Sequence, residues 1–385
     1  MSMFEQPYDT VFRQPDYPQV MIRAAEPTDN AQLLALVATP MPSAGVLLSL
    51  SRQPDYFVAA RAAFTHVETW VLVPIDSPCD ILAMYALSMR PCYINGKVEM
   101  LRYLGDLRVA PSARGQRLLR LMMRHLKQRM PEPYYSQAVV LSDNIKAKQM
   151  LHQAKADFVQ HYPDRLLYTA TMTGSRRPLS DTADQPFSQR TATAEDVSLL
   201  NGFVQKMAQY FNFLPRYDFF DLLKGHPYWN GMSIGDFTLV FRARQLVGIF
   251  GLWDQHTFKQ SKIERYHPLL ALLRPLYNVW ARANHGLVLP ERGQPLSYLM
   301  LHSPLCRPDE LDVFDFMLRS AFAQTVQRGV PALCYSLAEH DPRRVVQLRH
   351  HGRIMSGVHG FYSFGADPQP QFDHSKISYL ECGRI

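Results

Sequence analysis

The chain has 385 residues, of which 47% are apolar and 19% charged, and this balance excludes a disordered, collagen-like or coiled-coil protein. Its five cysteines are odd in number, widely spaced and without a CxxC pair, so we expect neither a disulfide framework nor a bound metal. The formal net charge of +7 favours an anionic partner such as nucleic acid, an acidic lipid or a polyphosphate cofactor.

The beginning of the chain carries no apolar run of the kind found in signal peptides, and we expect a cytoplasmic protein. Residues 30–51 carry no charge, but Pro40, Pro42 and Gly45 interrupt this stretch. It therefore predicts a helix followed by a buried loop and not a membrane span.

Periodicity and turn residues predict the elements of the first half. Asn95-Gly96 is a strong hairpin signal, because both positions of such a turn need a positive φ. In chain order we expect a strand near 20–24, helices near 28–38 and 52–63, strands near 67–74, 80–90 and 97–109, a helix at 114–130, a strand at 134–142, a helix at 144–155 and closing strands at 158–172. This order mixes hairpins with crossover helices, which predicts an α/β (α+β) fold with a mostly antiparallel mixed sheet flanked by helices.

The second half of the chain repeats features of the first. Residues 174–188 are polar and aperiodic, as in a linker, and divide the chain into domains at 1–173 and 189–385. The pattern R-x-A-x-x-x-D-x-x-x-L occurs at Arg23–Leu33 and again at Arg190–Leu200, where a strand would lead into a helix with an aspartate at its start. The simplest explanation is a tandem repeat of one fold.

Residues 103–120 carry the strongest functional signal. A strand ends at Val109, Pro111 stops it, and a helix begins soon afterwards. The unpaired N–H groups at such a helix start suit a pyrophosphate, and Arg114 can add charge-assisted hydrogen bonds. No acidic residue occurs between positions 107 and 131, so we expect a phosphate-binding site here.

This stretch resembles the phosphate loop of the GNAT acetyltransferase superfamily, [QR]-x-x-G-x-[GA] preceded by V-x-P. Val109, Pro111 and Arg114 match it, whereas Arg117 and Leu119 stand at the family's Gly and Gly/Ala positions. The wider sequence is similar to bacterial tandem-GNAT proteins of unassigned substrate. The resemblance implies that the first domain uses acetyl-CoA, or another acyl-CoA, as cosubstrate of an N-acyltransferase. The residues that it implies at the cofactor are Leu107, Arg108, Val109, Arg114, Gly115, Gln116, Arg117, Leu118, Leu119, Asn144 and Ala147.

The resemblance leaves the catalytic residues open. The family's acid, a tyrosine seven residues after Asn144, is Leu151 here, and the adjacent His152 is turned about 100° away on a helix. The family's bases lie on the strand that ends at Val109, where Tyr103 and Asp106 are the catalytic candidates. Packing or a structural hydrogen bond is the alternative for both, and Asp106 would face the site only if a bulge re-aims it.

The loop at 40–57 would cover the acceptor cleft of a GNAT protein. Arg52, Asp55 and Tyr56 are therefore the substrate-binding candidates, and the alternative is that they start a helix and fill the core. As acceptor we expect the amine of a small molecule or peptide, and we expect no nucleic acid and no membrane as partner.

The second half lacks the Arg-Gly loop. A strand near 296–303 is followed by a helix at 310–328, and Asp309, Glu310 and Asp312 at the helix start repel a phosphate. An insertion at about 254–295 carries aromatic and basic residues. We interpret the second half as a degenerate GNAT-like domain that is structural or contributes to the acceptor site between the domains.

Two other functions remain open. The altered phosphate loop and the missing tyrosine are also expected of a catalytically inactive acyl-CoA-binding or sensory protein. A nucleic-acid-binding protein is a minor alternative, because the basic residues cluster beside the phosphate-type loop and not along an aromatic groove.

Overall fold

The computed structural model describes residues 11–12, 19–43, 46–115, 118–130, 132, 135–142, 144, 158–174, 186–284, 286–350 and 352–385. Gln116 and Arg117 of the predicted phosphate loop lie outside the described residues. So does the predicted helix at 144–155 beyond its first residue, with Ala147, Leu151 and His152.

The first half contains the predicted alternation of strands and helices. The helices expected at 28–38, 52–63 and 114–130 are α1 (Asn30–Val37), α2 (Tyr56–Ala63) and α3 (Leu118–Arg129). The Asn95-Gly96 turn has the expected positive φ values of 51° and 83°. The main strands are β2 (Val20–Ala24), β5 (His66–Pro74), β6 (Ala83–Ile94), β7 (Lys97–Val109), β8 (Tyr135–Leu141) and β9 (Gln160–Thr173).

The second half follows the same order with different lengths. Its helices are α5 (Val197–Met207), α6 (Phe219–Leu223), α7 (Pro268–Ala283), α8 (Leu311–Gln327) and α9 (Arg344–Arg349). Its main strands are β10 (Phe187–Thr191), β13 (Phe237–Arg242), β14 (Gln245–Trp253), β16 (Leu299–Cys306), β17 (Ala332–Ala338) and β18 (Gly352–Ser363).

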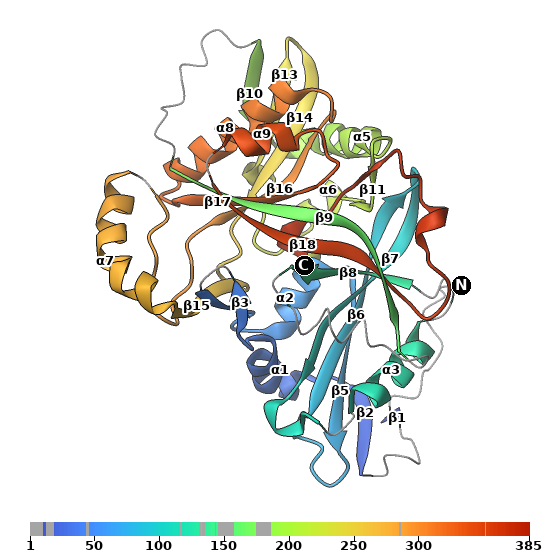
Figure 1. Ribbon diagram of the computed structural model, residues 1–385. Coiled ribbons are helices and arrows are strands. Elements are labelled where there is room, and N and C mark those ends of the chain that lie inside the picture. The colour runs from blue at the N-terminus through green and yellow to red at the C-terminus, as the bar shows by residue number, and fades with distance from the viewer. Residues whose placement is uncertain are drawn as a thin grey trace.

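The two halves form one continuous mixed sheet, and each contributes a closing strand to the other. In the described residues the strand order is β1-β2-β5-β6-β7-β8-β18-β9-β17-β16-β14-β13-β10, where β1 is the short strand Val11–Phe12. Strand β7 is parallel to β8, and β16 is parallel to β17. Strand β18 of the second half lies between β8 and β9 of the first, and β9 pairs with β17. Figure 1 shows β9 and β18 side by side where the two halves meet. The expected mixed fold is confirmed, and the exchanged strands join the halves.

The sequence repeat has the same local structure in both halves. Arg23 donates to both oxygens of Asp29 at 2.7 and 2.9 Å, and Arg190 donates to both oxygens of Asp196 at 2.6 Å each. Each aspartate also accepts a backbone N–H three residues earlier, at the entry to the helix. The shared pattern therefore encodes a strand-to-helix corner, as predicted.

The expectation of a buried loop after the first helix is wrong. Two short strands, β3 (Met41–Ser43) and β4 (Val46–Ser51), occupy that segment. Strand β4 pairs antiparallel with β15 (Gln260–Tyr266), which belongs to the insertion in the second half. Because its partner strand lies more than 200 residues away, β4 has no local signal beyond its uncharged composition.

The core of the first half lies between the sheet and its helices. Leu121 and Leu126 of α3 are fully buried, as are Val71 and Leu72 of β5. The apolar face predicted for α3 therefore packs on the sheet and leaves Arg120 and Lys127 exposed. In the described part of the chain, no helix has the length and apolar character needed to cross a bilayer.

The short helical turn Cys382–Arg384 contacts both halves of the molecule. Arg384 is fully buried and donates to the carbonyl oxygens of Ala62 and Tyr228 at 2.6 and 2.7 Å. Its guanidinium carbon lies 3.6 Å from the centroid of the Tyr228 ring, and it bonds His302 Nε2 at 2.9 Å. One side chain thus connects α2 of the first half with two segments of the second.

Candidate functional site

Strands β7 and β8 form a fork in the first half. They pair in register only at Tyr103 and Gln137 among the described residues, and beyond that point they diverge. A cavity of about 330 Å³ lies in the opening and is lined by both strands, by α2 and by residues of the second half. The fork therefore exposes the edges of two strands to a space that a ligand can enter.

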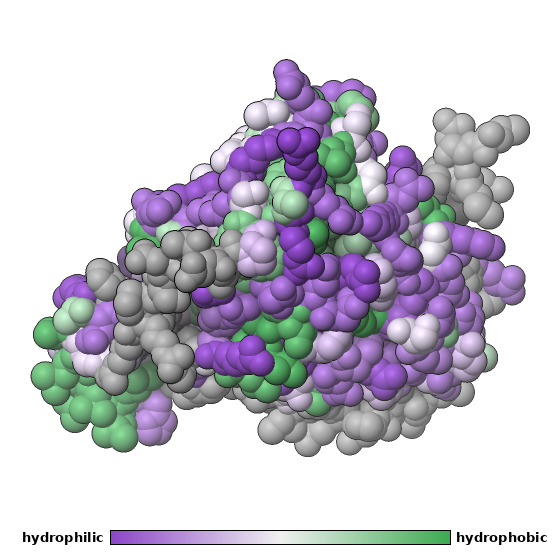
Figure 2. Space-filling model, turned by 90° about the horizontal axis from the view of Figure 1, so that it is seen from above, coloured by the Kyte–Doolittle hydropathy of each residue, from purple (hydrophilic) through white to green (hydrophobic). Residues whose placement is uncertain are grey.

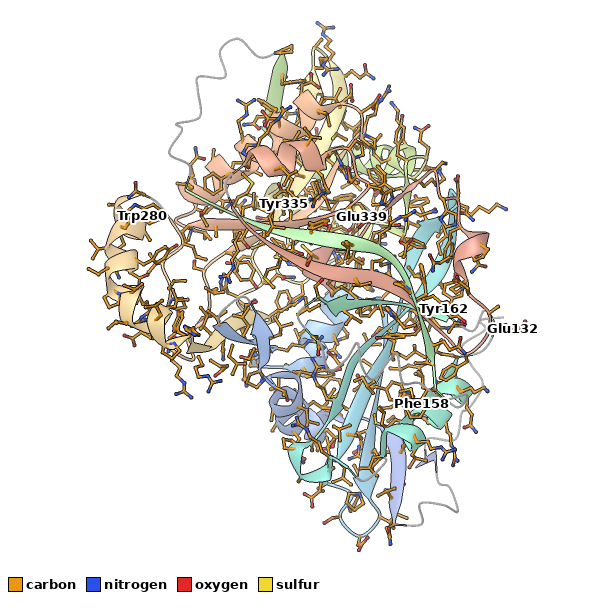
Figure 3. All side chains as sticks on the ribbon, viewed as in Figure 1. Glu132, Phe158, Tyr162, Trp280, Tyr335 and Glu339 are labelled. Atoms are coloured by element: carbon orange, nitrogen blue, oxygen red, sulfur yellow. The ribbon has the colours of Figure 1, made fainter. Side chains whose placement is uncertain are left out.

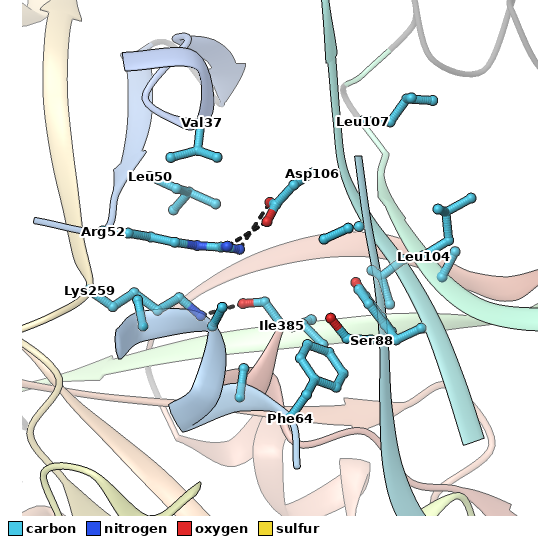
Figure 4. A pocket seen from close by; sticks show the side chains of 18 of the residues that line it. Val37, Leu50, Arg52, Phe64, Ser88, Leu104, Asp106, Leu107, Lys259 and Ile385 are labelled. Atoms are coloured by element: carbon cyan, nitrogen blue, oxygen red, sulfur yellow. Dashed lines mark hydrogen bonds and ion pairs between the residues drawn. The ribbon is translucent and has the colours of Figure 1, made fainter. Parts of the chain in front are cut away.

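A bulge at Asp106 turns its side chain into this cavity. The register between β6 and β7 shifts between Met84 and Ala86, opposite this point, and Asp106 has a φ of 51°. From the sequence, Asp106 is expected to face the site only if a bulge turns its side chain, and the strand has such a bulge. The Asp106 carboxylate accepts from Arg52 at 2.5 and 3.0 Å (Figure 4). It also accepts from the hydroxyl of Tyr56 at 2.9 Å.

The ion pair keeps Asp106 charged. Burial alone would raise the pKa of Asp106, but the adjacent guanidinium of Arg52 holds this pKa below its usual value. Arg52 and Tyr56, both expected at the substrate, line the cavity with Asp106. The three side chains line one side of the cavity. Asp106 belongs to β7, Tyr56 is the first residue of α2, and Arg52 lies four residues before it.

Tyr103 lies where the fork opens. Its ring packs against that of Phe64 with centroids 5.2 Å apart, and it lines the cavity. Burial raises the pKa of Tyr103 to about 12. The phenol therefore stays protonated near neutral pH, and it is suited to donate a proton or a hydrogen bond and not to act as a base.

The second half supplies a lysine to the same cavity. Lys259, just before β15, donates to the backbone oxygens of Gly383, at 3.3 Å, and of Ile385 (Figure 4). Burial lowers the pKa of Lys259 to about 8, and the positive charge of Arg52 adds to this effect. The cavity thus contains an amine that loses its proton near pH 8.

The second half has an equivalent fork, and protein side chains fill it. Ser303 has a φ of 42°, at a register shift between β14 and β16, so it occupies the position that Asp106 has in β7. The Glu381 carboxylate accepts the N–H of Ser303 at 2.7 Å, and Arg384 bonds the neighbouring His302. The segment around Glu381 therefore lies where the first fork has its cavity.

No protein-family model matches the sequence, and no match was found among curated proteins. Solved structures do match, over nearly the whole chain. The N-myristoyltransferase of Saccharomyces cerevisiae, solved with bound myristoyl-CoA, has a TM-score of 0.58 at 8% identity and covers 97% of this chain and 92% of its own. A GCN5-related N-acetyltransferase from Sphaerobacter thermophilus has a TM-score of 0.53 at 12% identity, with 95% and 100% covered. A tandem GNAT protein from the clavulanic acid biosynthesis pathway has a TM-score of 0.51 at 12% identity, with 91% and 100% covered.

This chain has the tandem GNAT fold. Both GNAT units contain the fork and the bulge, and only the fork of the first unit opens on the cavity described above. The resemblance found in the sequence is confirmed at the level of the fold.

The structure distributes the residues expected at the cofactor over three places. Leu107, Arg108 and Asn144 line the cavity of the first GNAT unit. Val109, Leu118 and Leu119 pack against the core, Leu118 with only 5% of its surface exposed. Arg114 and Gly115 are exposed just before α3, and Gly115 has a φ of 87°, which favours glycine.

Asp55 has a structural place. Its carboxylate accepts the backbone N–H groups of Phe57 and Val58 at 2.7 and 3.0 Å and so caps the start of α2. It does not line the cavity, unlike the neighbouring Arg52 and Tyr56. Of the two roles expected for Asp55, substrate binding or the start of a helix, the structure shows the second.

Several residues at the cavity were not foreseen from the sequence. Lys259, Trp253 and Phe258 come from the second half and were not named as site residues, although a contribution of that half to the site was one of the two alternatives stated for it. The alanines of α2 did carry a usable signal, because a run of small side chains on one helix leaves space beside it. Those that line the cavity are Ala59, Ala60, Ala62 and Ala63.

Replacing Asp106 with asparagine should lower the free energy of unfolding by about 2 kcal/mol, because Arg52 would lose its charged partner. The cost is below that of a fully buried pair, since the side chains of Arg52 and Asp106 keep 20% and 12% exposure. Because the pKa of Asp106 is lowered in the folded protein, the wild type should lose the same contribution as the pH falls from about 4 through that lowered pKa. Urea denaturation between neutral and acid pH measures both effects.

Asp29→Asn is the matched control, because it breaks a similar arginine–aspartate pair away from the cavity. Both variants should lose stability, and only Asp106→Asn should also lower turnover of the folded protein. Equal turnover in the two variants would contradict a role for Asp106 at the site.

Proposed function

We propose that the protein is an acyl-CoA-dependent N-acyltransferase that uses the fork of its first GNAT unit. The observation that supports this most is the contrast between the two forks: the first opens on a cavity of about 330 Å³, and Glu381 and Arg384 fill the second. This volume is at the lower end of small-molecule sites and favours a short acyl group such as acetyl. The acceptor amine would enter from the side formed by α2 and Lys259.

The residues of the first fork fit a coenzyme A thioester. An extended chain with amide groups can hydrogen-bond the edges of β7 and β8 where these strands diverge beyond Tyr103. Towards the phosphates, Arg114 and the left-handed Gly115 precede the positive end of α3, a helix without acidic residues. Gln116 and Arg117 complete this loop in the sequence.

The bulge at Asp106 is the position that we propose for the thioester carbonyl. In the second unit the N–H of Ser303 binds a carboxylate oxygen of Glu381, so the backbone at this bulge favours a negatively charged oxygen. The N–H of Asp106 is the equivalent group of the first unit, beside the cavity. We propose that it stabilises the charge that develops on the carbonyl oxygen during acyl transfer.

Lys259 would act as the general base and Tyr103 as the general acid. The acceptor nitrogen forms a bond to the acyl carbon and gives its proton to neutral Lys259, while the carbon–sulfur bond breaks and the thiolate leaves. Tyr103, protonated because its pKa is raised to about 12, would donate to the leaving sulfur. Arg52 and Tyr56, held by Asp106, would form the wall against which the acceptor binds.

The test is acetyl-CoA binding by calorimetry, followed by turnover with a panel of amines. Binding with release of free coenzyme A in the presence of one amine would support the proposal. Binding without turnover on any amine would instead support an inactive acyl-CoA-binding or sensory protein, the alternative left by the sequence. The absence of binding to acetyl-CoA and to longer acyl-CoAs would contradict both.

Reversing the charge of Arg114 should weaken acyl-CoA binding about tenfold or more at low salt, because the variant places a carboxylate beside a diphosphate. Lys127→Glu is the matched control, since it makes the same change in net charge at an exposed residue of α3, the helix that follows Arg114. Calorimetric titration of Arg114→Glu and Lys127→Glu with acetyl-CoA compares the two. Equal losses would show that the effect is one of net charge and not of a site at Arg114.

A further inference from the structure

Helix α7 exposes a broad apolar face. Leu272, Leu276, Val279 and Leu269 have 75%, 72%, 65% and 61% of their surface exposed, and Leu273 and Trp280 are also exposed. Their spacing of three and four residues places them on one side of the helix. Figure 2 shows hydrophobic residues gathered at the projecting end of the molecule, and Figure 3 places Trp280 at its outer edge.

The opposite face of α7 is firmly attached. Leu270 packs against the cluster of Ile263 and Tyr266 on β15. The side-chain amide of Asn278 donates to the carbonyl of Leu289 and accepts its N–H, both at 2.9 Å. The helix is therefore held in this orientation, and its exposed face is part of the folded structure.

Helix α7 carries basic residues and no acidic one, and the nearest acidic residues in the sequence are Glu264 and Glu291. The sequence from Arg265 to Pro290 contains Arg265, Arg274 and Arg282 and no acidic residue. Arg265 and Arg282 are exposed, whereas Arg274 donates to the carbonyl of Pro290 at 2.8 Å. Basic residues beside an exposed apolar stripe are typical of helices that bind anionic membrane surfaces.

The shape and size of the face also favour a lipid surface. The exposed apolar side chains all belong to one helix, whereas a stable protein interface buries about 800 Å² per partner over roughly 20–30 residues. The helix projects from the molecule (Figure 1), so it can enter a bilayer without a matching groove. Tyr277 and Trp280, with ring centroids 5.8 Å apart, lie near its C-terminal end and suit the boundary between headgroups and acyl chains.

We propose that α7 docks the protein on the surface of an anionic lipid bilayer. The leucines and Val279 would enter the outer part of the acyl region, and Arg265 and Arg282 would contact headgroup phosphates. This proposal departs from the sequence-based expectation of no membrane partner, because the exposed side of α7 is visible only in the tertiary structure. It does not depend on the proposed acyl transfer.

The test is co-sedimentation of the full chain with vesicles of phosphatidylcholine alone and of phosphatidylcholine mixed with phosphatidylglycerol. The wild type should bind the mixed vesicles, more strongly at low salt, and Leu272→Glu/Leu276→Glu should lower this binding about tenfold or more. The matched control is Val345→Glu/Leu348→Glu, which adds the same charges at two side chains of α9 that are 50% and 62% exposed. The control should bind like the wild type.

Trp280 gives an independent signal in the same samples. The other three tryptophans, Trp70, Trp229 and Trp253, are at most 5% exposed, so quenching by brominated lipids reports mainly on Trp280. We expect quenching in the mixed vesicles and its loss in the α7 double variant. The proposal is overturned if the wild type binds neither vesicle, or if the double variant binds as well as the wild type. It is also overturned if light scattering shows a dimer that the double variant abolishes, because the face would then bind a second copy.

Discussion

Lys259→Met should lower kcat/KM for acyl transfer by about 100-fold or more, because a positioned general base contributes on the order of 10²–10⁴ to the rate. The affinity for acetyl-CoA should be unchanged, since we propose that Lys259 faces the acceptor and not the phosphates. Lys262→Met is the matched control, because Lys262 lies three residues further on, within β15, and does not line the cavity. Steady-state kinetics with the best amine of the panel, beside calorimetry, measures both quantities.

The pH dependence separates Lys259 from Asp106 as the base. With a pKa of about 8, Lys259 is protonated at lower pH, so the rate should rise as the pH passes through 8 in the wild type and in Lys262→Met. Asp106, with its lowered pKa, is ionised over this whole range and would give no such rise. If Lys259→Met retained both the rate and the rise, the titrating base would be another group, such as the acceptor amine itself.

The same lysine makes a prediction about stability. The pKa of Lys259 is about 8 in the folded protein and about 10.4 in an unfolded chain, so the unfolded chain binds more protons between these two values. The free energy of unfolding should therefore rise with pH in this window for the wild type relative to Lys259→Met. Urea denaturation at the two ends of the window measures the difference.

Arg384→Met should lower the free energy of unfolding by about 3–5 kcal/mol, because it removes charged hydrogen bonds to buried carbonyl groups and leaves these groups unpaired. The carbonyls belong to Ala62 in the first half and Tyr228 in the second. Arg384 also stacks on the Tyr228 ring, at 3.6 Å, and bonds His302. The variant therefore removes contacts within the second fork and contacts between the halves.

Arg244→Met is the control, because Arg244 is exposed in the turn between β13 and β14. Urea denaturation followed by tryptophan fluorescence compares the two variants. If Arg384→Met lowered the free energy of unfolding no more than Arg244→Met does, the contacts of Arg384 would not stabilise the association of the two halves. Hydrogen exchange of α2 gives a second check, since the carbonyl of Ala62 in this helix accepts from Arg384.

Local features of the fold were predictable from the sequence, because short-range interactions form them. The Asn95-Gly96 turn, the corners with Arg23–Asp29 and Arg190–Asp196, and the apolar face of α3 depend only on residues close together in the chain. The same holds for the Arg114-Gly115 segment before α3. These features were enough to predict a repeated mixed α/β fold that resembles GNAT proteins.

The candidate site was predictable only in part. Arg52, Tyr56, Tyr103 and Asp106 were named from the sequence, and all four line the cavity. The direction of the Asp106 side chain depends on a bulge, which sequence periodicity cannot reveal. One extra residue in a strand leaves the alternation on either side intact. The N-cap role of Asp55 followed from its position before α2, yet the sequence could not separate it from substrate binding.

Local sequence determined the repeated corners, the basic helix and four of the residues at the cavity. Tertiary structure alone decided the exchange of β9 and β18, the placement of Lys259 opposite Asp106, and the filling of the second fork by Glu381 and Arg384. The physical reason is distance along the chain. The pairing of residue 51 with residue 260, and the contact of residue 303 with residue 381, depend on how whole strands pair. Strand pairing is set by the burial of the entire sheet and not by the residues at either end of the contact.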